Sequence, residues 1–157
     1  MTGLKQLRMD KNLTQLQIAQ FVHTLPSVVA QWELCSRYPT LGQMIKLCRV
    51  LDCTPVQLFE GYADGRDIPF FDLKNPPAIV QLPQGDISHP CHFALSLPYS
   101  LSERVQAGDT CYFELCSDAK SGDIVVCTDS NCNCSITVCS TDTANIAAVC
   151  RMLVTSM

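Results

Sequence analysis

The sequence predicts a two-domain α + β protein, with a helical domain first and a mainly antiparallel β domain after it. Three observations support this division. Apolar residues recur at helical spacing up to about residue 61, and five of the nine prolines fall between residues 61 and 90. From residue 91 on, short apolar segments alternate with turn residues. We therefore expect a helical domain at 1–61, a proline-rich linker or arm at 62–90 and a β-rich domain at 91–157.

Capping residues and apolar spacing predict the first three helices. One helix is expected at about 4–11, with leucines facing inward. Thr14 followed by Gln17 has the spacing of a capping box, which indicates the start of a second helix. Pro26 suits the first turn of a third helix, because the N–H that proline lacks has no helical partner there. A break near residues 23–24 separates these two helices, as in a helix-turn-helix unit.

Two further capping boxes complete the helical domain. Thr40 with Gln43 opens a helix that buries an apolar face, and Thr54 with Gln57 opens a short one. Five short helices in about 60 residues predict a compact all-α domain.

The β domain is predicted from five segments rich in β-branched and aromatic residues. These segments are 92–97, 110–115, 123–128, 134–139 and 146–153. Residues 78–82, inside the predicted arm, are either a first strand or a clamp across this domain. We expect no helix of any length after residue 91.

Charge divides the chain in the same way. The whole sequence has a net charge of −4, but residues 1–61 carry +2 and residues 62–157 carry −6. A mildly basic first domain joined to an acidic second domain is typical of a protein that has a DNA-binding module and a separate second domain. The apolar runs are too short to cross a bilayer, and no signal-peptide core follows Met1. We expect a cytoplasmic protein that has no contact with membranes.

The helical segment carries a set of landmarks between residues 4 and 59: Arg8, Leu13-Thr14-Gln15, Ile18-Ala19, Val29, Trp32-Glu33, Arg37-Tyr38-Pro39 and Leu58-Phe59. With these landmarks it resembles the DNA-binding domain of the Cro and phage-repressor family, the XRE type of helix-turn-helix regulator. The resemblance implies a λ-repressor-like five-helix fold. The sequence departs from the family at His23 and Cys35, where glycine is usual. Histidine tolerates a left-handed backbone better than most residues, so Cys35 is the larger departure.

The resemblance also implies a set of DNA contacts. The helix that begins at Pro26 would enter the major groove, where Ser27, Val28 and Gln31 would face base edges. Gln15 would bond a phosphate, and Arg37 is the expected cationic phosphate contact, ahead of Lys5. A solvated helix face is the alternative for Ser27 and Gln31. For Arg8 we favour an internal pair with Glu33 over a DNA contact.

The second half contains Gly108-Asp109 and Gly122-Asp123, each followed by an apolar strand, and Ser100-Leu101 ahead of the first pair. In these motifs it resembles, more faintly, the C-terminal domain of LexA-like and phage-repressor proteins (peptidase S24-like), which cleave themselves with a Ser–Lys dyad and carry the nucleophile at the position of Ser100. At the position of the basic lysine this sequence has Cys139. The cleavable Ala-Gly or Cys-Gly bond of the linker is also missing. We therefore expect no enzyme activity, and we interpret Ser100 as a loop serine bonded to backbone.

The eleven cysteines are expected to be reduced and to pack as small apolar residues. Cys127, Cys132, Cys134 and Cys139 lack the usual spacing of a zinc site, and the cluster 89–92 is a weaker candidate. We predict neither metal nor cofactor. The sequence leaves open whether some cysteines bind metal or sense redox state.

The resulting hypothesis is a sequence-specific transcriptional regulator, of the prophage-repressor type, that binds a double-stranded operator as a homodimer. The second domain would serve dimerisation or effector binding, because one small helix with few polar contacts binds weakly alone. The alternative is a helix-turn-helix adaptor that binds proteins, such as an antirepressor or toxin partner. A self-cleaving serine peptidase is a third possibility. The sequence gives neither the operator, nor the regulated genes, nor the inducing signal.

Overall fold

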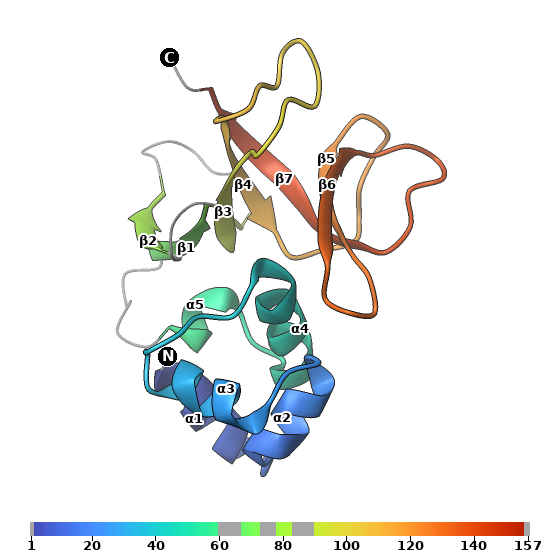
Figure 1. The fold of residues 1–157 in the computed structure, drawn as a ribbon. Helices are drawn as coiled ribbons and strands as arrows, with labels where there is room; N and C mark the ends of the chain where they lie inside the picture. Colours follow the sequence, from blue (N-terminus) through green and yellow to red (C-terminus); the bar gives the residue numbers. More distant parts are fainter. Residues whose placement is uncertain (1, 60–66, 73–77, 83–89, 156–157) are drawn as a thin grey trace. The chain divides into compact units, whose positions relative to one another are not determined.

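The computed structural model describes residues 2–59, 67–72, 78–82 and 90–155, which form a helical unit and a β unit (Figure 1). The helical unit contains α1 (Thr2–Asp10), α2 (Gln15–Phe21), α3 (Pro26–Glu33), α4 (Leu41–Leu51) and α5 (Pro55–Leu58). These are the five helices that the sequence predicts. A two-domain α + β protein is therefore confirmed.

The helices of the first unit enclose one apolar core. Its largest fully buried side chains include Leu4, Ile18, Trp32, Met44 and Leu47, so every one of the first four helices contributes. Burying each such side chain stabilises the fold by about 1.5–3 kcal/mol. This core fixes which side of each helix remains available to a partner.

The β unit is a seven-stranded sheet. The strands are β1 (Asp67–Phe71), β2 (Ala78–Gln81), β3 (Phe93–Ser96), β4 (Thr110–Glu114), β5 (Ile124–Thr128), β6 (Cys134–Val138) and β7 (Ile146–Val154). Their order across the sheet is β2-β1-β3-β4-β7-β5-β6. Only β1 and β3 pair in parallel, and the remaining neighbours are antiparallel. No described residue after 91 lies in a helix, as expected.

The strand β1 is a correction to the prediction of a linker or irregular arm at 62–90. Residues 67–71 pair with β2 on one side and β3 on the other, and both Ile68 and Phe71 are buried. Pro69 had suggested irregular structure, because proline removes a donor from a ladder. The apolar side chains around it nevertheless bury enough surface to hold the strand. For residues 78–81 the structure selects the strand over the clamp.

The sheet is curled rather than flat. The central strands β3, β4 and β7 each bury three consecutive residues, so both of their faces are covered. The register shifts between Tyr112 and Phe113 and between Val126 and Cys127, and such bulges bend a sheet. The hydroxyl of Tyr99, after β3, donates to the carbonyl of Ile136 in the edge strand β6 at 2.9 Å. This bond joins the segment after β3 to the opposite edge of the sheet.

Candidate nucleic-acid interface

The helix α2 begins where its capping box predicts. The Thr14 hydroxyl accepts from the backbone N–H of Gln17 at 3.1 Å, and the Gln17 side-chain oxygen accepts from the Thr14 N–H at 2.8 Å. Two otherwise unsatisfied donors at the helix start are thereby paired. Ile18 and Ala19 are fully buried, which fixes the orientation of α2 on the core.

The turn between α2 and α3 uses a left-handed residue without glycine. His23 has φ +53°, and the N–H of Thr24 bonds the carbonyl of Ala19 at 2.9 Å. Cys35 ends α3 in the same way, with φ +60° and a bond from Ser36 N–H to the Gln31 carbonyl. Both departures from the family's glycines therefore keep the backbone conformation that glycine would provide. Two further residues, Asn12 and Asp52, have a positive φ and end α1 and α4. These two left-handed positions were not predicted from the sequence.

The helix α3 has one face in the core and another in solvent. Val29 and Trp32 are buried, whereas Ser27 and Gln31 are exposed and Val28 is partly buried. Pro26 occupies the first turn and is partly buried. Within the part of the chain that the structure describes, the side-chain amide of Gln31 has no hydrogen-bond partner. The residues predicted to face base edges are thus available, while the contact itself stays a prediction.

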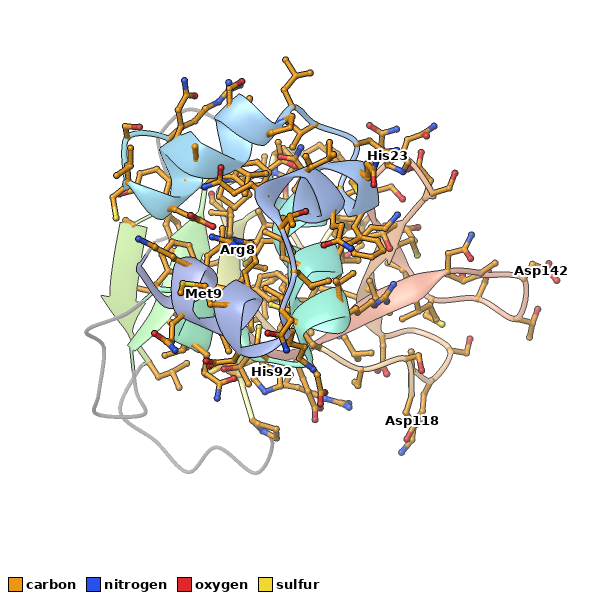
Figure 2. All side chains as sticks on the ribbon, turned by 90° about the horizontal axis from the view of Figure 1, so that it is seen from below. Arg8, Met9, His23, His92, Asp118 and Asp142 are labelled. Carbon is orange, nitrogen blue, oxygen red and sulfur yellow. The ribbon has the colours of Figure 1, made fainter. Side chains whose placement is uncertain are left out.

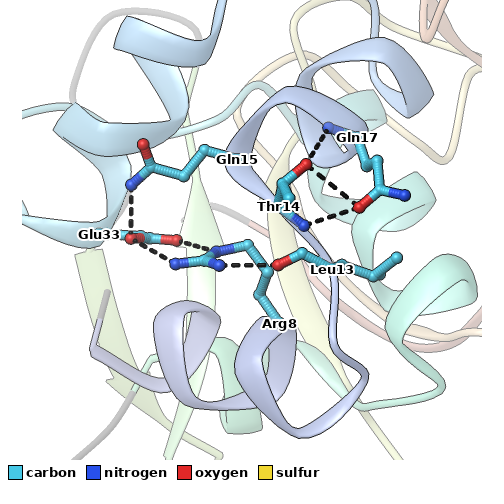
Figure 3. A network of polar contacts seen from close by, with 6 residues as sticks. All are labelled: Arg8, Leu13, Thr14, Gln15, Gln17 and Glu33. Atoms are coloured by element: carbon cyan, nitrogen blue, oxygen red, sulfur yellow. Dashed lines mark hydrogen bonds and ion pairs between the residues drawn. The ribbon is translucent and has the colours of Figure 1, made fainter.

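A buried ion pair fixes α3 against α1 (Figure 3). Arg8 Nε donates to Glu33 Oε1 at 2.6 Å, and Arg8 also donates to the Leu13 carbonyl at 2.7 Å. Figure 2 shows Arg8 among the side chains of the helical unit, whereas Asp118 and Asp142 lie at loop tips of the β unit. The internal Arg8–Glu33 pair that we favoured over a DNA contact is confirmed.

Gln15 belongs to the same network, which the sequence did not indicate. Its Nε2 donates to Glu33 Oε2 at 2.9 Å. An amide nitrogen carries two hydrogens, so one N–H of Gln15 remains for a phosphate oxygen. The phosphate contact stays a prediction. The structure shows that Gln15 is oriented by Glu33, so a phosphate bound there would be linked to α3.

The helix-turn-helix segment itself is almost uncharged. Residues 12–36 contain no lysine or arginine, and their single acid is Glu33, which Arg8 neutralises. Arg37 is exposed just after α3, as predicted, and Lys5, Lys11 and Arg49 are exposed elsewhere in the helical unit. Phosphate contacts must therefore come mainly from residues that flank the two helices.

Apolar side chains accompany the polar ones around α3. Leu25, at the N-cap, is 65% exposed, and Leu34, at the C-cap, is 78% exposed. Leu16 of α2 is 54% exposed. Single exposed leucines are common on protein surfaces. Here two of them lie at the two ends of α3, so both are available to any partner that this helix contacts.

In the β unit, Ser100 is bound within its own loop. Its hydroxyl donates to Gln106 Oε1 at 3.0 Å and accepts from the N–H of Ala107 at the same distance. Cys139, which the LexA-like resemblance would place at the lysine position, is buried and packs with Val125 and Val149. Among the described residues, the hydrogen-bond partners of Ser100 are Gln106 and Ala107, and neither of them packs against Cys139.

All eleven cysteines are thiols, and none is assigned to a disulfide. Of the four weighed as zinc ligands, Cys132 and Cys139 are buried, Cys134 is exposed and Cys127 is partly buried. Among the described residues, no group of three or more histidine, cysteine, aspartate or glutamate side chains is placed to hold a metal ion.

The fold and this surface define a helix-turn-helix domain, and comparison with known families agrees. Residues 4–58 match a family model described as "HTH_3: Helix-turn-helix", over a little more than a third of the chain. The match supports a DNA-binding regulator of the XRE type. The comparison with curated proteins gives no match. No described helix is both long enough and apolar enough to span a membrane. The LexA-like resemblance of the β unit stays a prediction.

Proposed function

We propose that this chain is a sequence-specific transcriptional regulator of the prophage-repressor type that binds operator DNA as a homodimer. The observation that carries the proposal is α3, with Ser27 and Gln31 exposed on a helix that a buried ion pair holds in place. Glutamine can bond adenine N6 and N7 together, and serine can bond either donor or acceptor edges.

The dimer is proposed from the charge and size of this surface. Each protomer offers few cations, and most affinity for DNA comes from phosphate contacts. Two protomers on half-sites about 34 Å apart would double both the phosphate and the base contacts. We assign dimerisation or effector binding to the β unit, whose acidic sequence is unsuited to DNA.

We also propose that the β unit does not cleave the chain. The two hydrogen bonds of Ser100 support a structural role, and a serine needs an adjacent base to become a nucleophile. Purified protein incubated at high pH, where a lysine base is deprotonated, is expected to remain one band on a denaturing gel. Two fragments would contradict this part of the proposal.

The test of the main proposal is a band-shift of the purified full chain on the DNA that flanks its own coding region, with scrambled DNA as competitor. Gln31→Ala is expected to lose about 1–3 kcal/mol of specific binding and to leave the fold intact. The matched control is Gln20→Ala, which removes an exposed glutamine from α2 instead. Equal loss in both variants, or no specific shift by a folded dimer, would overturn the proposal.

A second function is favoured by the exposed leucines. A helix-turn-helix adaptor that binds an antirepressor or toxin partner would use Leu25 and Leu34 at the ends of α3. This reading predicts no salt-dependent DNA complex, whereas a DNA-binding regulator requires a negative slope of affinity against salt concentration. Measuring the slope therefore separates the two functions.

A further inference from the structure

Two cysteines meet at the end of α4. The backbone N–H of Cys53 bonds the carbonyl of Cys48 at 3.0 Å, across the left-handed residue Asp52. Helices that end in this way bring the side chains of the two bonded residues into contact, and usually this contact is apolar. Here the two side chains are thiols, and they hydrogen-bond each other.

The two thiols are not equivalent. Cys48 is only 3% exposed, whereas Cys53 is partly open to solvent. The hydrogen bond from Cys48 is the main influence on Cys53 and lowers its pKa, and the charge of Lys11 adds the smallest effect in the same direction. Burial and the Asp52 carboxylate oppose this shift without reversing it. The same bond and burial raise the pKa of Cys48, which therefore keeps its proton.

The described cysteines include one other pair of hydrogen-bonded thiols. Cys111 and Cys150 bond each other, and this bond lowers the pKa of Cys150, but the two residues lie on different strands, β4 and β7, and not at one helix end. Burial raises the pKa of Cys91, Cys116 and Cys127. A thiolate is the reactive form of cysteine, so reactivity should concentrate where hydrogen bonding lowers the pKa of a thiol that solvent can reach.

We propose that Cys53 is a peroxide-reactive thiolate and that Cys48 is its resolving thiol, so that hydroperoxides convert the pair into an intramolecular disulfide. This site is independent of the DNA-binding function proposed above. The backbone bond at this helix end keeps the two residues together and their thiols hydrogen-bond each other, so the sulfur atoms need not be brought together by a change of fold.

The reaction has two steps. The Cys53 sulfur attacks one oxygen of hydrogen peroxide, the O–O bond breaks, and the leaving hydroxide takes a proton to become water. Cys53 is then a sulfenic acid. The Cys48 sulfur attacks the Cys53 sulfur, the S–O bond breaks as the S–S bond forms, and the departing hydroxide takes the Cys48 proton to leave as a second water. In sum, two thiols lose two electrons and two protons to one peroxide, which becomes two waters.

The sequence makes the product easy to detect. Trypsin cuts after Lys46, Arg49 and Arg66, so peptides 47–49 and 50–66 each contain one cysteine of the pair and no other. The fully reduced chain would receive one equivalent of hydrogen peroxide, then N-ethylmaleimide, then trypsin, followed by mass spectrometry. The expected main oxidised product is the two peptides joined, with a mass two hydrogens below their sum. Recovery of both as maleimide adducts while another cysteine is oxidised would overturn the proposal.

Three variants of the full chain separate the roles of the two thiols. Cys48→Ser is expected to stop the reaction at the Cys53 sulfenic acid, which the cyclic diketone dimedone captures. Cys53→Ser, at a partly exposed position that should not endanger folding, is expected to leave Cys48 as its maleimide adduct. Cys35→Ser removes an exposed thiol outside the pair, and it should leave the yield of joined peptides unchanged. Oxidation of Cys48 in Cys53→Ser at the original rate, or loss of the joined peptides in Cys35→Ser, would contradict the assignment.

Discussion

The guanidinium of Arg8 lies 2.6 Å from the carboxylate of Glu33, and the two side chains are 13% and 5% exposed. Glu33 ends α3, and Arg8 lies in the last turn of α1. Gln15 donates a further hydrogen bond to the same carboxylate. One acidic residue therefore joins three helices, and the orientation of the proposed DNA-reading helix depends on it.

Glu33→Gln should destabilise the helical unit by about 2–4 kcal/mol, because it leaves the Arg8 charge buried without a counter-charge. Urea unfolding followed by circular dichroism at 222 nm, which reports mainly helices, would measure the change. Glu103→Gln, at an exposed position of the β unit, is the control and should change stability by less than about 0.5 kcal/mol. Similar midpoints for both variants would mean that the ion pair adds little.

Gly3→Ala should destabilise the helical unit by about 1–3 kcal/mol. A Cβ at position 3 would lie 2.0 Å from the backbone oxygen of Gln57, so α1 or α5 would have to move. Gln6→Ala, on an exposed part of the same helix, is the control. Thermal unfolding would compare the two, and equal melting temperatures would show that α1 can shift without cost.

Cys35→Gly should stabilise the helical unit by about 0.5–1 kcal/mol, because it removes the strain of a side chain at φ +60°. Asn12→Gly should gain less, since asparagine tolerates a left-handed backbone better than most residues. Cys35→Ala controls for loss of the thiol and should give no gain. Unfolding midpoints in urea would rank the three variants, and a gain in Cys35→Ala equal to that in Cys35→Gly would point to the thiol instead.

The β unit should lose stability as the pH falls below about 6.5, the ordinary pKa of histidine. Burial lowers the pKa of His92 in the fold, and its Nδ1 accepts a hydrogen bond from the Leu115 N–H at 3.0 Å. The unfolded chain therefore takes up a proton at a higher pH than the folded chain, and stability falls until the folded pKa is passed. One proton gives a slope of at most about 1.4 kcal/mol per pH unit.

Denaturant unfolding of the β unit at pH 7.5 and at pH 5.5 would measure this loss, with tyrosine fluorescence as the signal. Carboxylates that titrate between these pH values contribute to the pH dependence of both the wild type and His92→Gln. The difference between the two slopes of unfolding free energy against pH is therefore the contribution of His92. The variant is expected to have the shallower slope. Parallel slopes would show that His92 does not titrate differently on folding.

Arg37→Gln should weaken any DNA complex on operator and scrambled DNA alike. It should also reduce the slope of log affinity against log salt by about 1 per protomer, as expected for one lost phosphate contact. Lys120→Gln makes the same charge change at an exposed position of the β unit and should leave the slope unchanged. Loss confined to the operator would instead make Arg37 a base contact.

Short-range patterns predicted most of the elements. Thr14, Thr40 and Pro26 mark helix starts because caps act over three or four residues, and the five predicted strands of the β unit are all present. The strand at 67–71 was missed because Pro69 argues against a ladder locally, and only pairing with β2 and β3 outweighs it. Asn12 and Asp52 were not predicted, although both residue types are enriched at left-handed positions, because both are equally common in ordinary turns.

The sequence by itself determined that this protein has a helix-turn-helix segment, where its helices start, and that few cations lie near it, since these properties depend on neighbouring residues and on composition. Tertiary structure decided which side chains share a partner. Gln15 reaches Glu33 across 18 positions, to a carboxylate that already binds Arg8 of a third helix. Such pairings depend on how helices pack and on what burial does to a charge. Neither can be read from spacing, because distance along the chain does not give distance in space.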